Sequence, residues 1–421
     1  MSQTKIITFL GKYPKQTTYG YADRTYKGQV FAEALHQFCQ YDTMLVCITE
    51  QAKASAWPVL EALGDSRIKP VDIPIGRTTE EMWETFKIIT QYVDEGDRVI
   101  FDITHGLRSL PFLVFLFAAY LKTAKNVTIE AIYYGAFELK NDREIAPVID
   151  LSEFVSMIDW LTATNRFVKL GDGQALANLL KSAIPSNSEL RDNPSTRPIK
   201  KQLKKSYEAI ENISLGLSIT RPIETMESTT QLEATIEESN AAFEQRAKPF
   251  SLLTDKIILE YGQFALENPK DIENFPANLK NQLAMIKWYI DRNQIVQATT
   301  LAREWLVSVL VFKFDLSAQM FNNKKGRKSV EDALNNVNQK RKNDSREIPS
   351  IECNEKLESL PEVDEIAKVW SKITWLRNDI AHVGMNLQPT SAANLKKNSV
   401  DLYPQLEQLA DRLLSNSDTI A

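Results

Sequence analysis

Short apolar stretches alternate with amphipathic stretches along the first third of the chain. The apolar stretches have the length of buried strands, and the stretches between them place apolar residues at helical spacing. The pattern predicts strands over 5–10, 43–49, 68–73, 98–104 and 127–134, and helices over 28–39, 56–63, 79–93 and 107–124. Strands that alternate with helices favour a mainly parallel, Rossmann-like sheet covered on both faces, which is an α/β fold.

Helical spacing replaces this alternation after residue 150. One helical face is formed by apolar residues, namely Leu151, Phe154, Val155, Ile158 and Leu161. Two polar stretches, 185–198 and 322–349, are predicted to be loops between helices. We therefore expect an α/β domain at 1–150, a helical connector at 151–284 and an all-α domain at 285–421.

The composition is that of an ordinary globular protein in a reducing compartment. The chain has 421 residues and a net charge of −5, so an RNA partner would need a local basic patch. The three cysteines show no metal-ligand spacing, and we expect no metal cofactor. The apolar run at 110–121 is shorter than the roughly 20 residues that span a bilayer, and the N-terminal residues lack a signal-peptide pattern. We expect a cytoplasmic protein with no membrane partner.

The predicted loop at 322–349 carries a local positive charge. It contains eight basic and four acidic residues. On an acidic protein such a segment is a candidate surface for RNA, although charge runs are also typical of solvated, disordered loops. The sequence leaves both interpretations open.

The stretch 102–111 joins a predicted strand to a predicted helix and reads Asp-Ile-Thr-His-Gly-Leu-Arg-Ser-Leu-Pro. Unpaired N–H groups at a helix start attract phosphate, Gly106 lets a ligand approach the backbone, and Arg108 adds a charged donor. Ligands of parallel sheets bind beyond the carboxyl ends of the strands. Near those ends lie Gly11 with its neighbour Lys12, Thr49, Gly76, Thr104 and Gly135. Gly11 and Gly135 could instead be turn glycines, and His105 could be a core histidine.

A second group of candidate residues lies on a predicted helix with an apolar line from Ile366 to Ile380. Arg377 falls on this line, and Asn378 and His382 are about 40° apart around the helix. An arginine on an apolar face needs a polar partner, which a twofold interface between two such helices would supply. The alternative is a helix-terminal histidine that its own surroundings satisfy.

These residue types fit metal-free RNA cleavage. In that reaction a ribose 2′-OH attacks the adjacent phosphorus and leaves a 2′,3′-cyclic phosphate. A guanidinium stabilises the charge on the phosphate, and an imidazole can move a proton at neutral pH. One chain offers one histidine here, so we expect a homodimer. The apolar stretch 112–117, which is hydrophobic around the whole helix, indicates burial against the sheet and a second subunit.

The two motifs together resemble a known family. The stretch 102–111 resembles the ligand loop of the CARF domain in CRISPR-associated CARF and HEPN ribonucleases of type III systems. The spacing of Arg377 and His382, with a polar residue after the arginine, resembles the HEPN signature. The stretch 297–304 looks like the first HEPN helix, in which Arg303 and Glu304 would support the core. The resemblance covers about 1–150 and 285–415 and leaves 159–281 unmatched.

The resemblance implies a homodimer, or an oligomer of dimers, whose CARF domains bind a cyclic oligoadenylate as allosteric activator. The family most often recognises cyclic tetra-adenylate. The helices after Leu151 would transmit the signal to HEPN domains that cleave single-stranded RNA without a metal. The resemblance assigns ligand binding to Thr104, His105, Gly106, Arg108, Ser109, Gly11, Gly135 and Ala136, and catalysis to Arg377, Asn378 and His382.

Two other functions remain open on the sequence. The chain could be a non-catalytic nucleotide sensor that binds a partner or nucleic acid through its helical half. It could also be a ring nuclease that cleaves its own activator in the N-terminal pocket, with Thr104, His105 or Lys12 positioning the attack. The sequence contains no P-loop and no dinucleotide-binding glycine motif, so an ATPase or a dehydrogenase is poorly supported.

Overall fold

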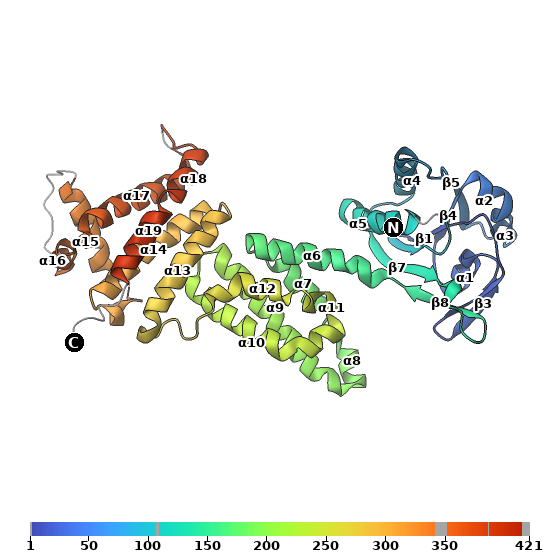
Figure 1. The fold of residues 1–421 in the computed structure, drawn as a ribbon, viewed down its shortest axis with the longest axis horizontal. Helices are drawn as coiled ribbons and strands as arrows, with labels where there is room; N and C mark the ends of the chain where they lie inside the picture. The colour runs from blue at the N-terminus through green and yellow to red at the C-terminus, as the bar shows by residue number, and fades with distance from the viewer. Residues whose placement is uncertain (1, 107–108, 323, 342–351, 386, 415–421) are drawn as a thin grey trace. The chain divides into compact units, whose positions relative to one another are not determined.

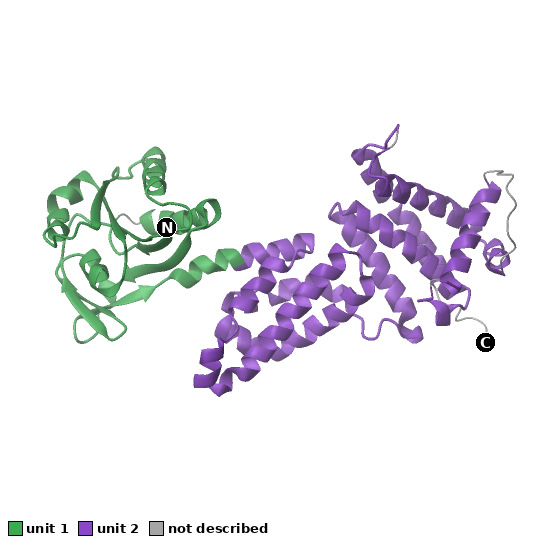
Figure 2. Ribbon diagram, turned by 180° about the vertical axis from the view of Figure 1, so that it is seen from behind, with its two compact units in different colours: residues 1–159 green, residues 160–421 purple. Residues whose placement is uncertain are grey.

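The computed structural model describes residues 2–106, 109–322, 324–341, 352–385 and 387–414. The chain forms two compact units, residues 1–159 and residues 160–421 (Figure 2). The first unit is built around a sheet and the second is helical, which confirms the α/β and all-α classes predicted for the two parts. The domain boundary near residue 284 stays a prediction.

The described part of the first unit contains an eight-stranded sheet (Figure 1). Its strands are β1 Thr4–Phe9, β2 Thr17–Tyr21, β3 Arg24–Gly28, β4 Thr43–Ile48, β5 Ile68–Asp72, β6 Arg98–Asp102, β7 Thr128–Gly135 and β8 Ile145–Asp150. Their order across the sheet is β3-β2-β8-β7-β6-β1-β4-β5. β1, β4, β5, β6 and β7 are mutually parallel, whereas β3 is antiparallel to β2 and β8 is antiparallel to β7. The prediction of a mainly parallel sheet is confirmed.

The five predicted strands correspond to these five parallel strands, and the direction of strand addition reverses at β1. The chain proceeds from β1 through β4 to β5 on one side, and then crosses to β6 and β7 on the other. Ligands of such doubly wound sheets bind beyond the carboxyl ends of the two strands between which the direction changes. Those strands are β1 and β6, so the loop after β1, residues 103–106 and Ser109 lie at the expected position for a ligand.

Strands β2, β3 and β8 are absent from the sequence prediction, which leaves 11–27 and 135–149 without strands. β3 is mostly exposed and polar, and β8 contains Pro147, so neither has the apolar alternation of a buried strand. Because β3 extends to Gly28, the helix predicted from residue 28 begins only at Phe31.

Helices cover both faces of the sheet. They are α1 Phe31–Phe38, α2 Glu50–Ser55, α3 Trp57–Glu61, α4 Thr79–Gln91 and α5 Ser109–Lys125. Successive residues of a strand point to opposite faces, so Ile6 packs in one hydrophobic cluster with α1, α2 and α3, and Ile7 in another with α4 and α5. One face of α5 is buried through Val114 and Phe117, but Phe112 on the same helix is 69% exposed. The second subunit expected on that exposed face stays a prediction.

The second unit is a set of packed helices with one large hydrophobic core. The helices from α6 onward are α6 Ser152–Leu170, which begins in the first unit, α7 Gln174–Ser182, α8 Asn187–Asp192, α9 Arg197–Ser218, α10 Pro222–Arg246, α11 Lys248–Ser251, α12 Thr254–Tyr261, α13 Phe275–Asp291, α14 Ile295–Lys313, α15 Gly326–Arg341, α16 Glu352–Glu358, α17 Val363–Ala381, α18 Ala392–Val400 and α19 Tyr403–Leu413. Among the described residues α14 alone is long and apolar enough to cross a membrane, and 61% of its apolar window is buried inside the protein. Such burial is typical of a core helix in a soluble protein.

The prediction of a loop at 322–349 is wrong for 326–341, which forms α15. Its apolar residues recur at helical spacing, with Val330, Leu334 and Val337 buried, and the high content of charge concealed this pattern. The basic side chains of this helix are not free. Ion pairs join Arg327 to Glu304, Lys328 to Asp332, Lys340 to Glu358 and Arg341 to Asp364. The other predicted loop, 185–198, likewise contains α8 and the start of α9.

Candidate functional site

A pocket of about 260 Å³ lies at the carboxyl edge of the parallel strands in the first unit. Its walls come from the loops after β1, β4 and β5 and from the start of α5. Six of the predicted ligand residues line it, namely Gly11, Lys12, Thr49, Gly76, Gly106 and Ser109. Because parallel strands end at the same edge, residues that are far apart in the sequence meet here.

Backbone conformation explains the glycine at position 106. Its φ angle is +115°, a region that L side chains rarely adopt, and a Cβ atom added there would lie 2.4 Å from Cδ1 of Leu110. Gly76 also has a positive φ angle, and its N–H donates to Oε2 of Glu81 at 2.8 Å. At both positions the main chain borders the pocket without an intervening side chain, so a ligand can contact the backbone closely.

A buried hydrogen-bond network fixes the loop that follows β6. Thr8 on β1 is fully buried and donates its hydroxyl to Oδ2 of Asp102 at 2.5 Å. The other carboxylate oxygen accepts the backbone N–H of Thr104 at 2.7 Å, and the Thr104 hydroxyl accepts the N–H of Gly135 at 2.7 Å. Burial raises the pKa of Asp102. The network joins β1, β6 and β7, so Thr104 anchors the loop and does not line the pocket.

His105 packs beneath the loop that follows β1. Its Nε2 accepts the backbone N–H of Phe31 at 3.3 Å, and a Cβ atom added at Gly11 would lie 3.5 Å from the Cβ of His105. Burial lowers the pKa of His105, which favours the neutral imidazole that this hydrogen bond requires. His105 is absent from the pocket lining, and these contacts place it between β1 and α1.

The remaining predicted ligand residues have other surroundings. A Cβ atom at Gly135 would lie 2.9 Å from the ring of Tyr19, so packing demands glycine there. Ala136 is fully buried and its N–H donates to the carbonyl of Pro147 at 2.9 Å. Neither residue lines the pocket. Arg108 lies outside the described residues.

The pocket of one chain is small for a cyclic oligonucleotide. Sites that enclose a small-molecule ligand usually measure about 300–1000 Å³, and this pocket is below that range. Its polar groups include backbone N–H groups, the Lys12 ammonium, the Gln51 amide and the hydroxyls of Thr49 and Ser109. These groups suit phosphate and ribose, and two copies of the pocket would be needed to enclose a symmetric ring.

The second group of candidates lies at the end of α17. Arg377, Asn378 and His382 are all exposed, and Nη1 of Arg377 donates to Oδ1 of Asn378 at 3.3 Å. The expectation that Arg377 continues the buried apolar line is wrong, because Leu376 takes that place. One step along a helix turns a side chain by about 100°, which moves Arg377 into solvent.

The helix end beside His382 combines backbone strain with exposed apolar side chains. The N–H of His382 donates to the carbonyl of Asn378 at 3.0 Å and ends the helix. Val383 follows with a φ angle of +48°, which is unfavourable for a β-branched residue. Val383, Met385 and Leu387 are 74%, 83% and 102% exposed. Exposed apolar residues next to polar candidates suit a surface that a second molecule covers.

Arg303 and Glu304 on α14 join neighbouring helices. Arg303 binds Glu304 at 2.5 Å and Glu331 of α15 at 2.6 Å, and Glu304 also binds Arg327 of α15 at 2.7 Å. These ion pairs fit the supporting role predicted for both residues.

Thr8 is the residue that motif inspection overlooked in the first unit. A threonine within the apolar stretch 5–10 could have indicated this role, because a polar group in a buried strand needs a hydrogen-bond partner. No group of three or more histidine, cysteine, aspartate or glutamate side chains able to hold a metal ion occurs among the described residues.

Comparison with known proteins identifies a match in the middle of the chain. Residues 156–267 match the family described as the second domain of CRISPR-associated protein MJ1674. A stretch of 124 residues is 30% identical to CRISPR-associated protein MJ1674 of Methanocaldococcus jannaschii, and it covers 29% of this chain and 19% of that protein. The chain thus matches about a fifth of the length of its curated relative. The family match falls in the region for which the sequence motifs offered no resemblance.

Proposed function

We propose that this chain is an endoribonuclease of type III CRISPR defence that a cyclic oligoadenylate activates and that cleaves single-stranded RNA without a metal. The similarity of residues 156–267 to a CRISPR-associated protein supports a role in CRISPR defence. The observation that carries the nucleotide-sensing part is the pocket of the first unit. Six residues expected to contact the activator line this one cavity, at the point where doubly wound sheets bind nucleotides.

The proposed chemistry uses the side chains at the end of α17. The imidazole of His382 removes the proton of a ribose 2′-OH, which attacks the adjacent phosphorus. The guanidinium of Arg377 stabilises the charge on the phosphate oxygens, and the bond to the 5′-oxygen of the next nucleotide breaks. A second imidazole, from the partner subunit, donates a proton to that leaving oxygen. The products are a 2′,3′-cyclic phosphate and a 5′-hydroxyl.

The homodimer required by this chemistry is supported by apolar surface on the first unit. Trp83 of α4 is 66% exposed, and Leu116 and Tyr120 of α5 are 47% and 45% exposed. They line an almost entirely apolar groove of about 430 Å³. Isolated exposed apolar residues are common, but a contiguous apolar patch usually marks an interface.

The decisive experiment is RNA cleavage in the presence of EDTA, with and without cyclic tetra-adenylate. We expect stimulated cleavage that yields 2′,3′-cyclic phosphate ends, and a loss of about 10²–10⁴-fold in His382→Ala. Lys368→Ala is the matched control, because Lys368 is an exposed cation on the same helix with no ion pair among the described residues. Full activity in His382→Ala would contradict the proposed chemistry.

Activation is tested separately at the first unit. Lys12→Ala removes the one cation among the described residues that line the pocket, and we expect about tenfold more cyclic tetra-adenylate to be needed for half-maximal stimulation. An unchanged requirement would contradict the assignment of this pocket to the activator.

A second candidate is a non-catalytic sensor. It is favoured by the exposure of His382, because no side chain among the described residues orients its imidazole. If the purified protein binds cyclic tetra-adenylate but leaves RNA intact in EDTA, the sensor replaces the ribonuclease. Loss of the cyclic activator during incubation, measured by mass spectrometry, would identify a ring nuclease in the first unit.

A further inference from the structure

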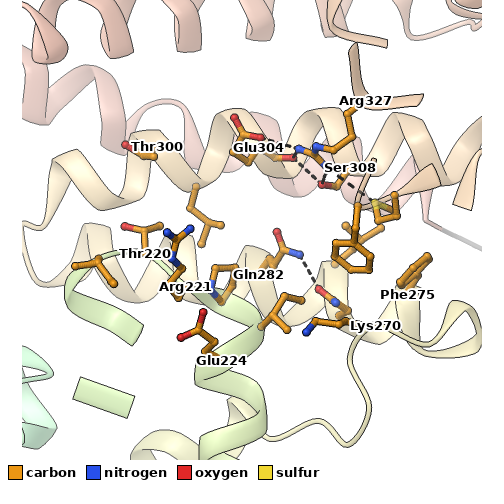
Figure 3. A pocket seen from close by; sticks show the side chains of 18 residues that line it. Thr220, Arg221, Glu224, Lys270, Phe275, Gln282, Thr300, Glu304, Ser308 and Arg327 are labelled. Carbon is orange, nitrogen blue, oxygen red and sulfur yellow. Dashed lines mark hydrogen bonds and ion pairs between the residues drawn. The ribbon is translucent and has the colours of Figure 1, made fainter. Parts of the chain in front are cut away.

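The second unit contains a cavity of about 490 Å³, larger than the pocket at the sheet (Figure 3). It is lined by the α9–α10 turn, Lys270, α13, α14 and α15. None of Arg377, Asn378 and His382 borders it. Its volume lies within the range of about 300–1000 Å³ that is usual for small-molecule sites.

One end of the cavity is suited to an anion. The 25-residue helix α10 begins there with Arg221 as N-cap and Pro222 in its first turn, and no side chain caps the helix start. The N–H groups of Ile223 and Glu224 therefore remain available as donors. Arg221 is exposed and has no ion pair among the described residues.

Lys270 adds a second exposed cation to the lining, again without an ion pair among the described residues. The third cation, Arg327, is different because Glu304 and Ser308 each bind it at 2.7 Å. Glu224 supplies an exposed carboxylate near Arg221 (Figure 3). Among the described lining residues, a ligand therefore meets the positive charges of Arg221 and Lys270 and the negative charge of Glu224.

The middle of the cavity presents an acceptor on a largely buried side chain. Gln282 is only 8% exposed, and its Nε2 donates to Oδ1 of Asn278 at 2.6 Å. Its amide oxygen has no partner among the described residues and is directed into the space between α13 and α14 (Figure 3). A carbonyl oxygen that faces a cavity from a largely buried side chain favours a ligand that carries an N–H or O–H donor.

The other end of the cavity is aromatic. Phe275 lies at the opposite end from Thr220 and Arg221 (Figure 3). It packs edge-on against Phe321, with ring centroids 5.8 Å apart, and Phe321 is 53% exposed. Exposed aromatic rings in a cavity bind planar ligands such as nucleobases by stacking.

We propose that this cavity binds a 5′-nucleotide whose base carries an amino group. The phosphate lies at the start of α10 with Arg221, the base lies against Phe321, and the amino group of the base donates to Oε1 of Gln282. Lys270, which lies toward the Phe275 side of the cavity (Figure 3), adds positive charge that attracts the nucleotide. The nucleotide is either free or the terminal unit of an RNA strand. This inference goes beyond the proposed function and does not depend on RNA cleavage or on the first unit.

The test is calorimetric titration of the full chain with 5′-AMP. We expect one site per chain, with binding weakened at least fivefold for adenosine, which lacks the phosphate, and for purine riboside 5′-monophosphate, which lacks the amino group. A 5′-phosphorylated oligoadenylate RNA distinguishes the two sources: tighter binding than AMP assigns the site to a strand end, and weaker binding assigns it to the free nucleotide. No binding of AMP or of this RNA at millimolar concentration overturns the proposal.

Variants locate the bound nucleotide. Arg221→Ala should weaken AMP about tenfold and Lys270→Ala severalfold, whereas Glu224→Gln should tighten it because a repelling charge is removed. Arg191→Ala is the matched control, since Arg191 is an exposed arginine of the same unit outside the cavity. All four positions are exposed, so the variants should fold, which circular dichroism verifies. Binding that survives Arg221→Ala but is lost in Lys12→Ala would place the nucleotide in the first unit and refute the proposal.

Discussion

Replacement of Thr8 by valine tests whether the buried network positions the pocket of the first unit. Valine has nearly the same shape as threonine but lacks the hydroxyl that donates to Asp102 at 2.5 Å. Thr8 is 0% exposed, so water cannot replace the lost donor without disturbing the packing. A hydrogen bond to a charged group is worth about 1.5–3 kcal/mol, and we expect the free energy of unfolding of the first unit to fall by about 2 kcal/mol.

The pH dependence of this loss has a defined sign. Burial raises the pKa of Asp102, and removal of the Thr8 donor raises it further, because that hydrogen bond favours the carboxylate. A carboxyl group with a raised folded pKa stabilises the fold fully below its unfolded pKa of about 4 and loses that contribution as the pH rises through the folded pKa. The difference between wild type and Thr8→Val should therefore be largest at pH 7 and shrink toward pH 4.

Hydrogen exchange of the β1 and β6 amides measures the effect, because it reports on the first unit alone. Thr90→Val is the matched control: Thr90 lies on α4 and its hydroxyl donates to the carbonyl of Phe86 at 2.7 Å, where no buried charge is involved. We expect the control to lose less than about 1 kcal/mol. Equal losses in the two variants, or an effect that does not vary with pH, would refute the role assigned to Thr8 and Asp102.

Three further predictions concern the same unit. Gly106→Ala should destabilise it by about 1–3 kcal/mol in denaturant unfolding, more than Gly96→Ala, because both glycines have positive φ angles but a Cβ at Gly106 would displace the Leu110 side chain, whereas a Cβ at Gly96 meets nothing within 4 Å. His105 has a lowered pKa, so below about pH 6.5 the unfolded chain takes up a proton that the folded chain does not, and stability should fall by up to about 1.4 kcal/mol per pH unit. His105→Gln should abolish this slope in pH-dependent unfolding, and an unchanged slope would exclude His105 as its source. Leu116→Asp should shift a dimer toward monomer in sedimentation velocity at micromolar concentration, whereas Leu139→Asp, which alters a leucine that is 60% exposed outside the apolar groove, should not; equal effects would reject the groove as the interface.

The sequence alone was sufficient for the parallel part of the sheet and for the edge at which the pocket lies. Strand and helix periods are local properties, and each apolar stretch between 5 and 134 could be recognised from its own residues. Once the strands are parallel, their carboxyl ends share one edge, so Gly11, Thr49, Gly76 and Gly106 had to lie near each other.

The sequence predictions failed where the outcome depended on a one-residue rotation about a helix axis, or on ion-pair partners that lie far away in the chain. Arg377 was placed on the apolar line of its helix, but the buried residue is Leu376, because the surrounding helices decide which side of α17 is covered. The helix at 326–341 was missed because its charges dominate the pattern, and their partners include Glu304 and Glu358 far away in the chain.

Tertiary structure alone decided the pairing of β2 with β8, the burial of Thr8 against Asp102, and the cavity between α10, α13 and α14. In each case the contact joins segments that are far apart in the sequence, and the apolar pattern of one segment does not indicate which other segment it will contact. The spacing of apolar residues along the chain determines which face of a helix or strand is apolar. The packing of whole elements determines which polar groups are buried next to each other, and these groups must then form hydrogen bonds with one another. The five parallel strands of this protein and the edge at which its first pocket lies therefore follow from its sequence, and its buried network and its second cavity follow only from the fold.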